Sequence, residues 1–105
     1  MKYTKTNPNI SFAEFVKKLS PVTDFSSSTG KRYKVVKHDA TIIYFKRLDS
    51  DNPDDTWNFD LSDLFKAYKT LTDFDTVNFK PFVPIRHSPA RGLLISTGLL
   101  VPIKS

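Results

Sequence analysis

The chain of 105 residues contains no cysteine, so neither disulfide bonds nor cysteine-bound metals can hold its fold together. A chain of this length is the usual size of one domain, and it buries roughly 60–70% of its unfolded surface, which is enough to fold without such cross-links. Hydrophobic residues make up 39% of the sequence and aromatic residues 13%, so the composition predicts a folded chain with one hydrophobic core. The lack of cysteine also excludes iron–sulfur clusters, thiol nucleophiles and cysteine-based zinc sites.

The apolar runs are too short for a membrane span, and the longest have only four residues, such as Ile42–Phe45. Residues 1–8 are basic but lead into no apolar segment, so we expect no signal peptide and a cytoplasmic location. We see no repeat and no linker. Residues 1–9 are expected to form a flexible tail, and residues 10–105 a single domain.

Three segments carry helix signals. Ser11 and Glu14 have the spacing of a capping box, which predicts a helix over residues 12–19 that ends before Pro21. Its apolar side chains repeat at helical spacing at Phe12, Phe15, Val16 and Leu19. Asp60 is expected to cap a second helix, whose apolar stripe consists of Leu61, Leu64, Phe65, Tyr68 and Leu71. Ser88 as cap and Pro89 at the first helical position predict a third helix that ends at Gly98.

Residues 33–37 and 41–45 are β-branched and aromatic runs that predict an antiparallel hairpin. A three-residue loop would pair Val35 with Phe45 and Lys37 with Ile43, whereas a two-residue loop would mix polar and apolar side chains on both faces. We prefer the first register, although its turn residues are not a favoured pair. It places one set of side chains on a common face: Arg32, Lys34, Val36, His38, Ile42, Tyr44 and Lys46.

The remaining segments give weaker signals. Residues 57–59 are expected to be a short third strand, and residues 77–84 an edge strand or an extended loop because two prolines interrupt them. The predicted fold is therefore α+β, with a two- to three-stranded antiparallel sheet packed against about three helices.

Charge is distributed unevenly along the chain. The formal net charge is +5, but residues 1–48 carry ten Lys/Arg against three acidic residues, and residues 49–75 carry eight Asp against two Lys. Residues 76–105 hold four Lys/Arg and no acidic residue. The fold can turn this pattern into a dipolar surface, or it can interleave the blocks so that they cancel.

Motifs for catalysis or cofactors are missing from the sequence. The two histidines, His38 and His87, lie in no nucleophile-elbow frame, and the three glycines have no phosphate-loop spacing. Asp49, Asp51 and Asp60 match three positions of a calcium loop, but Pro53 and Asp54 occupy positions that need a ligand and a glycine. We therefore expect no enzyme activity, no metal site and no cofactor.

The basic hairpin is the best candidate for a binding surface. Arg32, Lys34 and Lys46 share a predicted face with the aromatic ring of Tyr44, a combination that can neutralise phosphates and stack on an unpaired base. The competing interpretation is a solvated strand face that carries lysine for solubility. Arg86 and Arg91 flank the start of the third helix and form a candidate second phosphate contact. The alternative is an ordinary capped helix at which the two arginines have no binding role.

The sequence thus predicts a non-enzymatic binding domain whose first-choice partner is nucleic acid, bound electrostatically and with little sequence preference. The alternative is a protein-interaction or homo-oligomerisation module. That alternative would use aromatic residues such as Trp57 and the apolar C-terminal end, which contains Leu93, Leu94, Ile95, Leu99, Leu100, Val101 and Ile103.

Overall fold

A computed structural model describes residues 2–27, 30–39, 41–48, 56–83 and 87–103. In chain order the elements are β1 (Tyr3–Lys5), α1 (Phe12–Leu19), β2 (Asp24–Ser26), β3 (Arg32–His38), β4 (Ile42–Arg47), β5 (Thr56–Asp60), α2 (Leu61–Thr70), the 3₁₀ helix η1 (Thr76–Phe79), α3 (His87–Ser96) and β6 (Leu100–Pro102). The α+β class, the antiparallel pairing and the three α-helices are confirmed.

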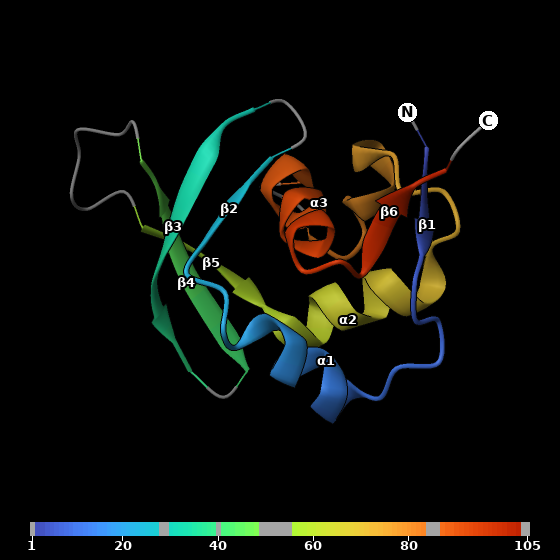
Figure 1. The fold of residues 1–105 in the computed structure, drawn as a ribbon, viewed down its shortest axis with the longest axis horizontal. Coiled ribbons are helices and arrows are strands. Elements are labelled where there is room, and N and C mark those ends of the chain that lie inside the picture. Colours follow the sequence, from blue (N-terminus) through green and yellow to red (C-terminus); the bar gives the residue numbers. More distant parts are fainter. Residues whose placement is uncertain (1, 28–29, 40, 49–55, 84–86, 104–105) are drawn as a thin grey trace.

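The strands form two sheets, which is more than the sequence predicted. Strands β2, β3, β4 and β5 make a four-stranded antiparallel sheet in that order, and β1 pairs with β6 in a separate two-stranded sheet. All three α-helices lie on one side of the four-stranded sheet (Figure 1). Strand β2 was not predicted because only Phe25 of its three residues is apolar. Its buried ring lies between two exposed neighbours, which is the alternation of a short strand with one covered face.

The β3–β4 hairpin contains a β-bulge that the sequence analysis did not anticipate. The predicted pairing of Val35 with Phe45 is confirmed, but the register shifts by one residue after Val35. Lys37 therefore lies opposite Tyr44, and the predicted pairing of Lys37 with Ile43 is wrong. The bulge has a physical reason, because the regular register would turn the Lys37 side chain toward the core.

The helix termini agree closely with the sequence signals. The Ser11 side chain accepts a hydrogen bond from the Glu14 amide at 3.2 Å, and the Asp60 carboxylate accepts one from the Ser62 amide at 2.8 Å. Helix α3 ends at Ser96, and Gly98 follows with a φ of 78°, which allows the amides of Gly98 and Leu99 to bond the carbonyls of Ile95 and Leu94. Only its start differs, since α3 begins at His87, one residue before the predicted Ser88 cap.

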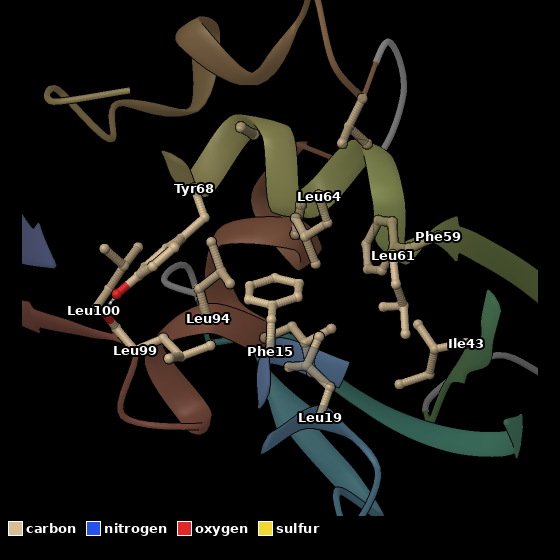
Figure 2. Packing of buried hydrophobic residues seen from close by; sticks show 14 of the residues in the cluster. Phe15, Leu19, Ile43, Phe59, Leu61, Leu64, Tyr68, Leu94, Leu99 and Leu100 are labelled. Carbon is tan, nitrogen blue, oxygen red and sulfur yellow. Dashed lines mark hydrogen bonds between the residues drawn. The ribbon is translucent and has the colours of Figure 1, made fainter. Parts of the chain in front are cut away.

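The core lies between the inner face of the four-stranded sheet and the helices. Its fully buried side chains include Phe15 and Leu19 from α1, Leu64 and Tyr68 from α2, and Leu94 from α3, which meet Ile43 and Phe59 of the sheet (Figure 2). Stacked and edge-on aromatic pairs extend the core along the sheet, such as Phe45 with Phe59 at 4.5 Å between ring centroids. A core this continuous is what a cysteine-free chain needs.

The segment that was expected to be a tail contains strand β1. Tyr3 lies opposite Pro102, and the Ile103 amide donates to the Lys2 carbonyl at 2.9 Å, so the two ends of the described chain run side by side (Figure 1). Residues 76–79, which overlap the start of the segment 77–84 predicted to be extended, form the 3₁₀ helix η1. Phe79 and Phe74 are buried there, which shows that packing of aromatic side chains decided the local conformation.

Candidate nucleic-acid interface

The candidate interface is the face of the four-stranded sheet that points away from the helices. We call it the outer face and define it by Arg32, Lys34, Lys37, Tyr44 and Lys46. The alternation of β3 produces it, because Tyr33 and Val35 face the core while Arg32 and Lys34, which alternate with them, point outward. No helix covers this face within the described chain (Figure 1).

Two lysines lie directly opposite each other at the centre of the outer face. Lys34 of β3 pairs with Lys46 of β4, and the row continues to Asp24 on β2 and Thr56 on β5. Directly opposed side chains have Cβ atoms about 4.5–5.5 Å apart, so two ammonium groups there repel each other. The negative charge of Asp24 offsets the charge of one lysine, so the row as a whole keeps a net positive charge that a bound anion would neutralise.

The aromatic member of the outer face is Tyr44, which is half-buried next to Lys37. The Lys37 ammonium lies 5.5 Å from the centroid of the Tyr44 ring, and it also lies 3.6 Å from a carboxylate oxygen of Asp39. The Lys37 side chain is 65% exposed, so water screens both contacts and the side chain can move off the ring at little cost. A flat base can then reach the ring of Tyr44.

The acidic residues of the described chain lie mainly elsewhere. Asp63 is in the first turn of α2, and Asp73 and Asp75 follow that helix, on the helical side of the sheet (Figure 1). Asp24 and Asp39, in contrast, lie beside lysines of the outer face, so acidic and basic side chains are partly interleaved there. Asp49 and Asp51, two of the three residues of the calcium-loop match, lie outside the described residues.

The structure does not bring Arg91 to the outer face. Its guanidinium donates to the Phe74 carbonyl at 3.3 Å and lies 5.4 Å from the centroid of the Tyr3 ring. These contacts place it beside β1 and η1, at the other end of the molecule from the β3–β4 hairpin (Figure 1). Arg86, its predicted companion, lies outside the described residues.

His38 also leaves the predicted face. The bulge places it opposite the buried residue Ile43, and its Nε2 atom is buried with no hydrogen-bond partner among the described residues. Lys37 faces outward instead, on the side of the sheet where a regular strand would place Val36 and His38. The sequence contained one signal of the bulge: a regular register would bury the charged side chain of Lys37.

Other site classes find no support in the described residues. They contain no group of three His, Cys, Asp or Glu side chains placed to hold a metal ion. Asp60, the described member of the calcium-loop match, caps α2. None of the described helices has the length and apolar character needed to cross a membrane.

The apolar C-terminal end is mostly interior. Leu93, Leu94, Leu99 and Leu100 are all at most 1% exposed, whereas Val101 and Ile103 are 38% and 49% exposed. Phe59, Phe74 and Phe79 are also buried. The alternative of a protein-interaction surface at this end therefore has little exposed apolar area available to it.

No known protein family, curated protein or solved structure matches this chain. Its function must be inferred from the chemistry of its own surface.

Proposed function

We propose that this protein is a nucleic-acid-binding domain that acts without catalysis, and that its outer face contacts the phosphate backbone. The observation that carries the proposal is the opposition of Lys34 and Lys46 at the centre of a sheet face that no described helix covers. Two like charges held face to face gain most when a polyanion replaces their counterions.

The other residues of the outer face extend this contact. Arg32 is exposed at the start of β3, and its guanidinium can bind a further phosphate through two parallel hydrogen bonds. Tyr44 offers an aromatic ring between the charged positions, on which an unpaired base stacks. Neutralising phosphates and stacking on a base involve no hydrogen bonds to the edges of the bases. We therefore expect the binding to tolerate different nucleic-acid sequences and to be stronger for single strands than for duplexes.

Salt dependence tests the contact quantitatively. With three phosphate contacts, from Arg32, Lys34 and Lys46, the slope of log K against log salt is expected to be about −2 for a single strand and about −3 for a duplex. Binding of labelled random oligonucleotides, measured by fluorescence anisotropy at several salt concentrations, gives both slopes.

A charge-reversal pair tests the location. Lys34→Glu with Lys46→Glu replaces one pair of opposed like charges with another, so it changes the sign of the surface while keeping a similar cross-strand repulsion. The matched control is Lys17→Glu with Lys66→Glu, which makes the same change in net charge at exposed positions on α1 and α2. We expect binding to be lost in the first variant and largely kept in the second. Absence of binding at low salt, or an equal loss in both variants, overturns the proposal.

A further inference from the structure

The two edges of the four-stranded sheet differ in what covers them. Helix α3 closes the edge at β2, because the two elements lie so close that a Cβ atom at Gly92 would clash with the carbonyl oxygen of Ser26 (Figure 1). The edge at β5 lacks such a cover among the described elements, since β5 pairs only with β4 and its one other extensive contact is with α2, which follows it directly. Proteins usually protect the edges of their sheets, so an open edge is a candidate for pairing with another strand.

The hydrogen-bond pattern of β5 shows which of its backbone groups point to the open edge. The Leu61 amide donates to the Thr41 carbonyl at 2.8 Å, so these residues, which follow β5 and precede β4, form a bonded pair. Bonded and non-bonded pairs alternate along an antiparallel ladder, so Phe59 also turns its amide and carbonyl toward β4, whereas Asn58 and Asp60 do not. The backbone amide and carbonyl of Asn58 therefore point away from the sheet.

Asn58 is at the centre of the open edge. Its side chain is exposed, and among the described residues no backbone group bonds its amide or its carbonyl. Thr56, two residues earlier, is also exposed and turns its backbone groups in the same direction. A second strand with the same spacing of donors and acceptors can replace the water at these groups, as happens when a sheet is extended by a partner strand.

We propose that β5 pairs with β5 of a second copy of this chain, antiparallel and in register about Asn58. In this register Asn58 lies opposite Asn58 of the second copy, and Thr56 lies opposite Asp60 of the second copy. The alignment uses all five residues of the strand, and it avoids the register in which two Asp60 carboxylates would repel each other. The Asn58 backbone groups then exchange hydrogen bonds across a two-fold axis, where the two side-chain amides also face each other as donors and acceptors. The strand is thus complementary to itself.

This pairing would place the outer faces of both copies on one side of a continuous sheet, because its two-fold axis is perpendicular to the sheet. The two β5 strands would separate Lys46 of one copy from Lys46 of the other by three strand spacings, about 14 Å. A single nucleic-acid strand that spans both copies would then contact more phosphates than one copy can reach. This consequence rests on the proposed function, whereas the pairing itself does not.

The size and charge of the contact predict a weak dimer. Each copy contributes one strand of five residues, and interfaces that bury less than about 1,200 Å² belong to weak or transient complexes. The net charge of +5 on each chain opposes association, and salt screens this repulsion. Dimerisation is therefore expected to strengthen with salt, whereas binding to nucleic acid weakens with salt. The opposite salt dependences distinguish the two processes.

Sedimentation equilibrium of the full chain without nucleic acid tests the pairing, at protein concentrations up to about 1 mM. We expect the average mass to rise from 12.0 kDa toward twice that value, and to rise further at higher salt. Hydrogen exchange of the Asn58 amide, followed by NMR, is expected to be fast in dilute solution and slower as the dimer forms. A mass of 12.0 kDa at every concentration overturns the proposal. Slow exchange of the Asn58 amide in dilute solution also overturns it, because the edge would then be covered within one chain.

A charge introduced at the two-fold axis tests the location. Asn58→Lys places two like charges opposite each other without changing a backbone bond between β4 and β5, so we expect it to weaken dimerisation by about tenfold or more. The matched control is Thr4→Lys, which adds the same charge at an exposed position on β1 and is expected to dimerise like the unmodified chain. Unchanged dimerisation of Asn58→Lys, or an equal loss in both variants, overturns the assignment to β5.

The same variant separates this proposal from the proposed function. Asn58 lies opposite Tyr44, so Asn58→Lys adds a positive charge beside the outer face and is expected to keep binding single strands. Lys34→Glu with Lys46→Glu is expected to lose that binding and to keep dimerising without nucleic acid. Dimers that disappear in this second variant would show that the outer face, and not the edge of β5, joins the two copies, and would overturn the proposal.

Discussion

The hydroxyl group of Tyr68 donates a hydrogen bond of 2.9 Å to the backbone carbonyl of Leu99, inside the core. The same oxygen accepts from the Asn7 amide at 3.2 Å. One side chain of α2 therefore joins the segment after β1 to the segment before β6. These two segments are almost the whole chain apart in sequence, and the hydroxyl group links the small sheet to the main core.

Removal of this hydroxyl group is expected to destabilise the protein. In Tyr68→Phe the Asn7 amide loses its partner, while the Leu99 carbonyl keeps its bond from Thr6, so we expect a loss of about 1–2 kcal/mol in the free energy of unfolding. Urea denaturation measures it. Tyr44→Phe is the control, because its ring is half-buried at the surface of the sheet, and it is expected to change stability by less than about 0.5 kcal/mol. Equal effects of the two changes would contradict the role given to Tyr68.

A glycine in the middle of α3 is required by close packing. A Cβ atom at Gly92 would clash with the carbonyl oxygen of Ser26 and would lie 2.7 Å from the Cα atom of Ser27. Alanine is the better helix former by about 1 kcal/mol, yet we expect Gly92→Ala to destabilise the protein by about 1–3 kcal/mol because backbone atoms of β2 block the methyl group. Thermal unfolding compared with Ser96→Ala, an exposed change on the same helix, checks the sign. A more stable Gly92→Ala variant would show that α3 and β2 lie further apart.

The β-bulge predicts that one residue can be deleted from a strand. Val36 is the extra residue between the pairs Val35–Phe45 and Lys37–Tyr44, and it is 46% exposed. Deletion of Val36 makes the pairing regular without moving any side chain to the other face, so we expect a folded protein that unfolds cooperatively. Deletion of Asn58 is the control, since β5 pairs with β4 without an extra residue and the deletion turns the residues before it to the wrong face. Cross-strand contacts in NMR spectra of both variants test this, and loss of the fold on deletion of Val36 would contradict the bulge.

The pH dependence of stability contains a contribution from Lys5. Burial, and after it the positive charge of Lys69, lowers the pKa of the Lys5 ammonium below its usual value of 10.5. The unfolded chain then binds more protons than the folded chain just below pH 10.5, so this group makes stability rise with pH in that window. We expect the free energy of unfolding, measured relative to Lys5→Gln, to increase as the pH rises toward 10.5.

A second variant checks the cause. Lys69→Gln removes the neighbouring charge and is expected to raise the titration midpoint of Lys5, followed by NMR of its side chain. The Lys5 ammonium also donates to the backbone carbonyl of Lys69 at 3.0 Å, a bond that Lys69→Gln leaves in place. A difference between the unmodified chain and Lys5→Gln that does not vary with pH would contradict this account.

Local signals in the sequence predicted the helices well, and long-range features were missed. The caps at Ser11 and Asp60 and the stop at Gly98 depend on residues within a single turn, so they can be recognised without the rest of the fold. Strands β1 and β6 have three residues each and are stabilised by each other, which no local pattern reveals. The 3₁₀ helix at residues 76–79 depends on packing of Phe79 in the same way.

The same division applies to the surface of the protein. Arg32, Lys34, Tyr44 and Lys46 lie on two adjacent strands, so a correct hairpin was enough to group them. The pocket between the end of the sheet and the first turn of α3 is lined from five separate segments, and only the placement of α3 against the sheet brings His87 near Lys31 and Trp57. Sequence reasoning therefore could not find this pocket.

The pairing of β1 with β6 also affects the rate at which the protein folds. Its partners, Tyr3 and Pro102, close a loop of nearly the whole chain, and the entropy lost in closing a loop grows with its length. We expect the β3–β4 hairpin to form early and the β1–β6 ladder to form last, after the helices have docked. A circular permutant that joins the two ends would turn this most distant contact into the most local one. It would keep the same native contacts and fold faster, because the order of segments along the chain limits the folding rate.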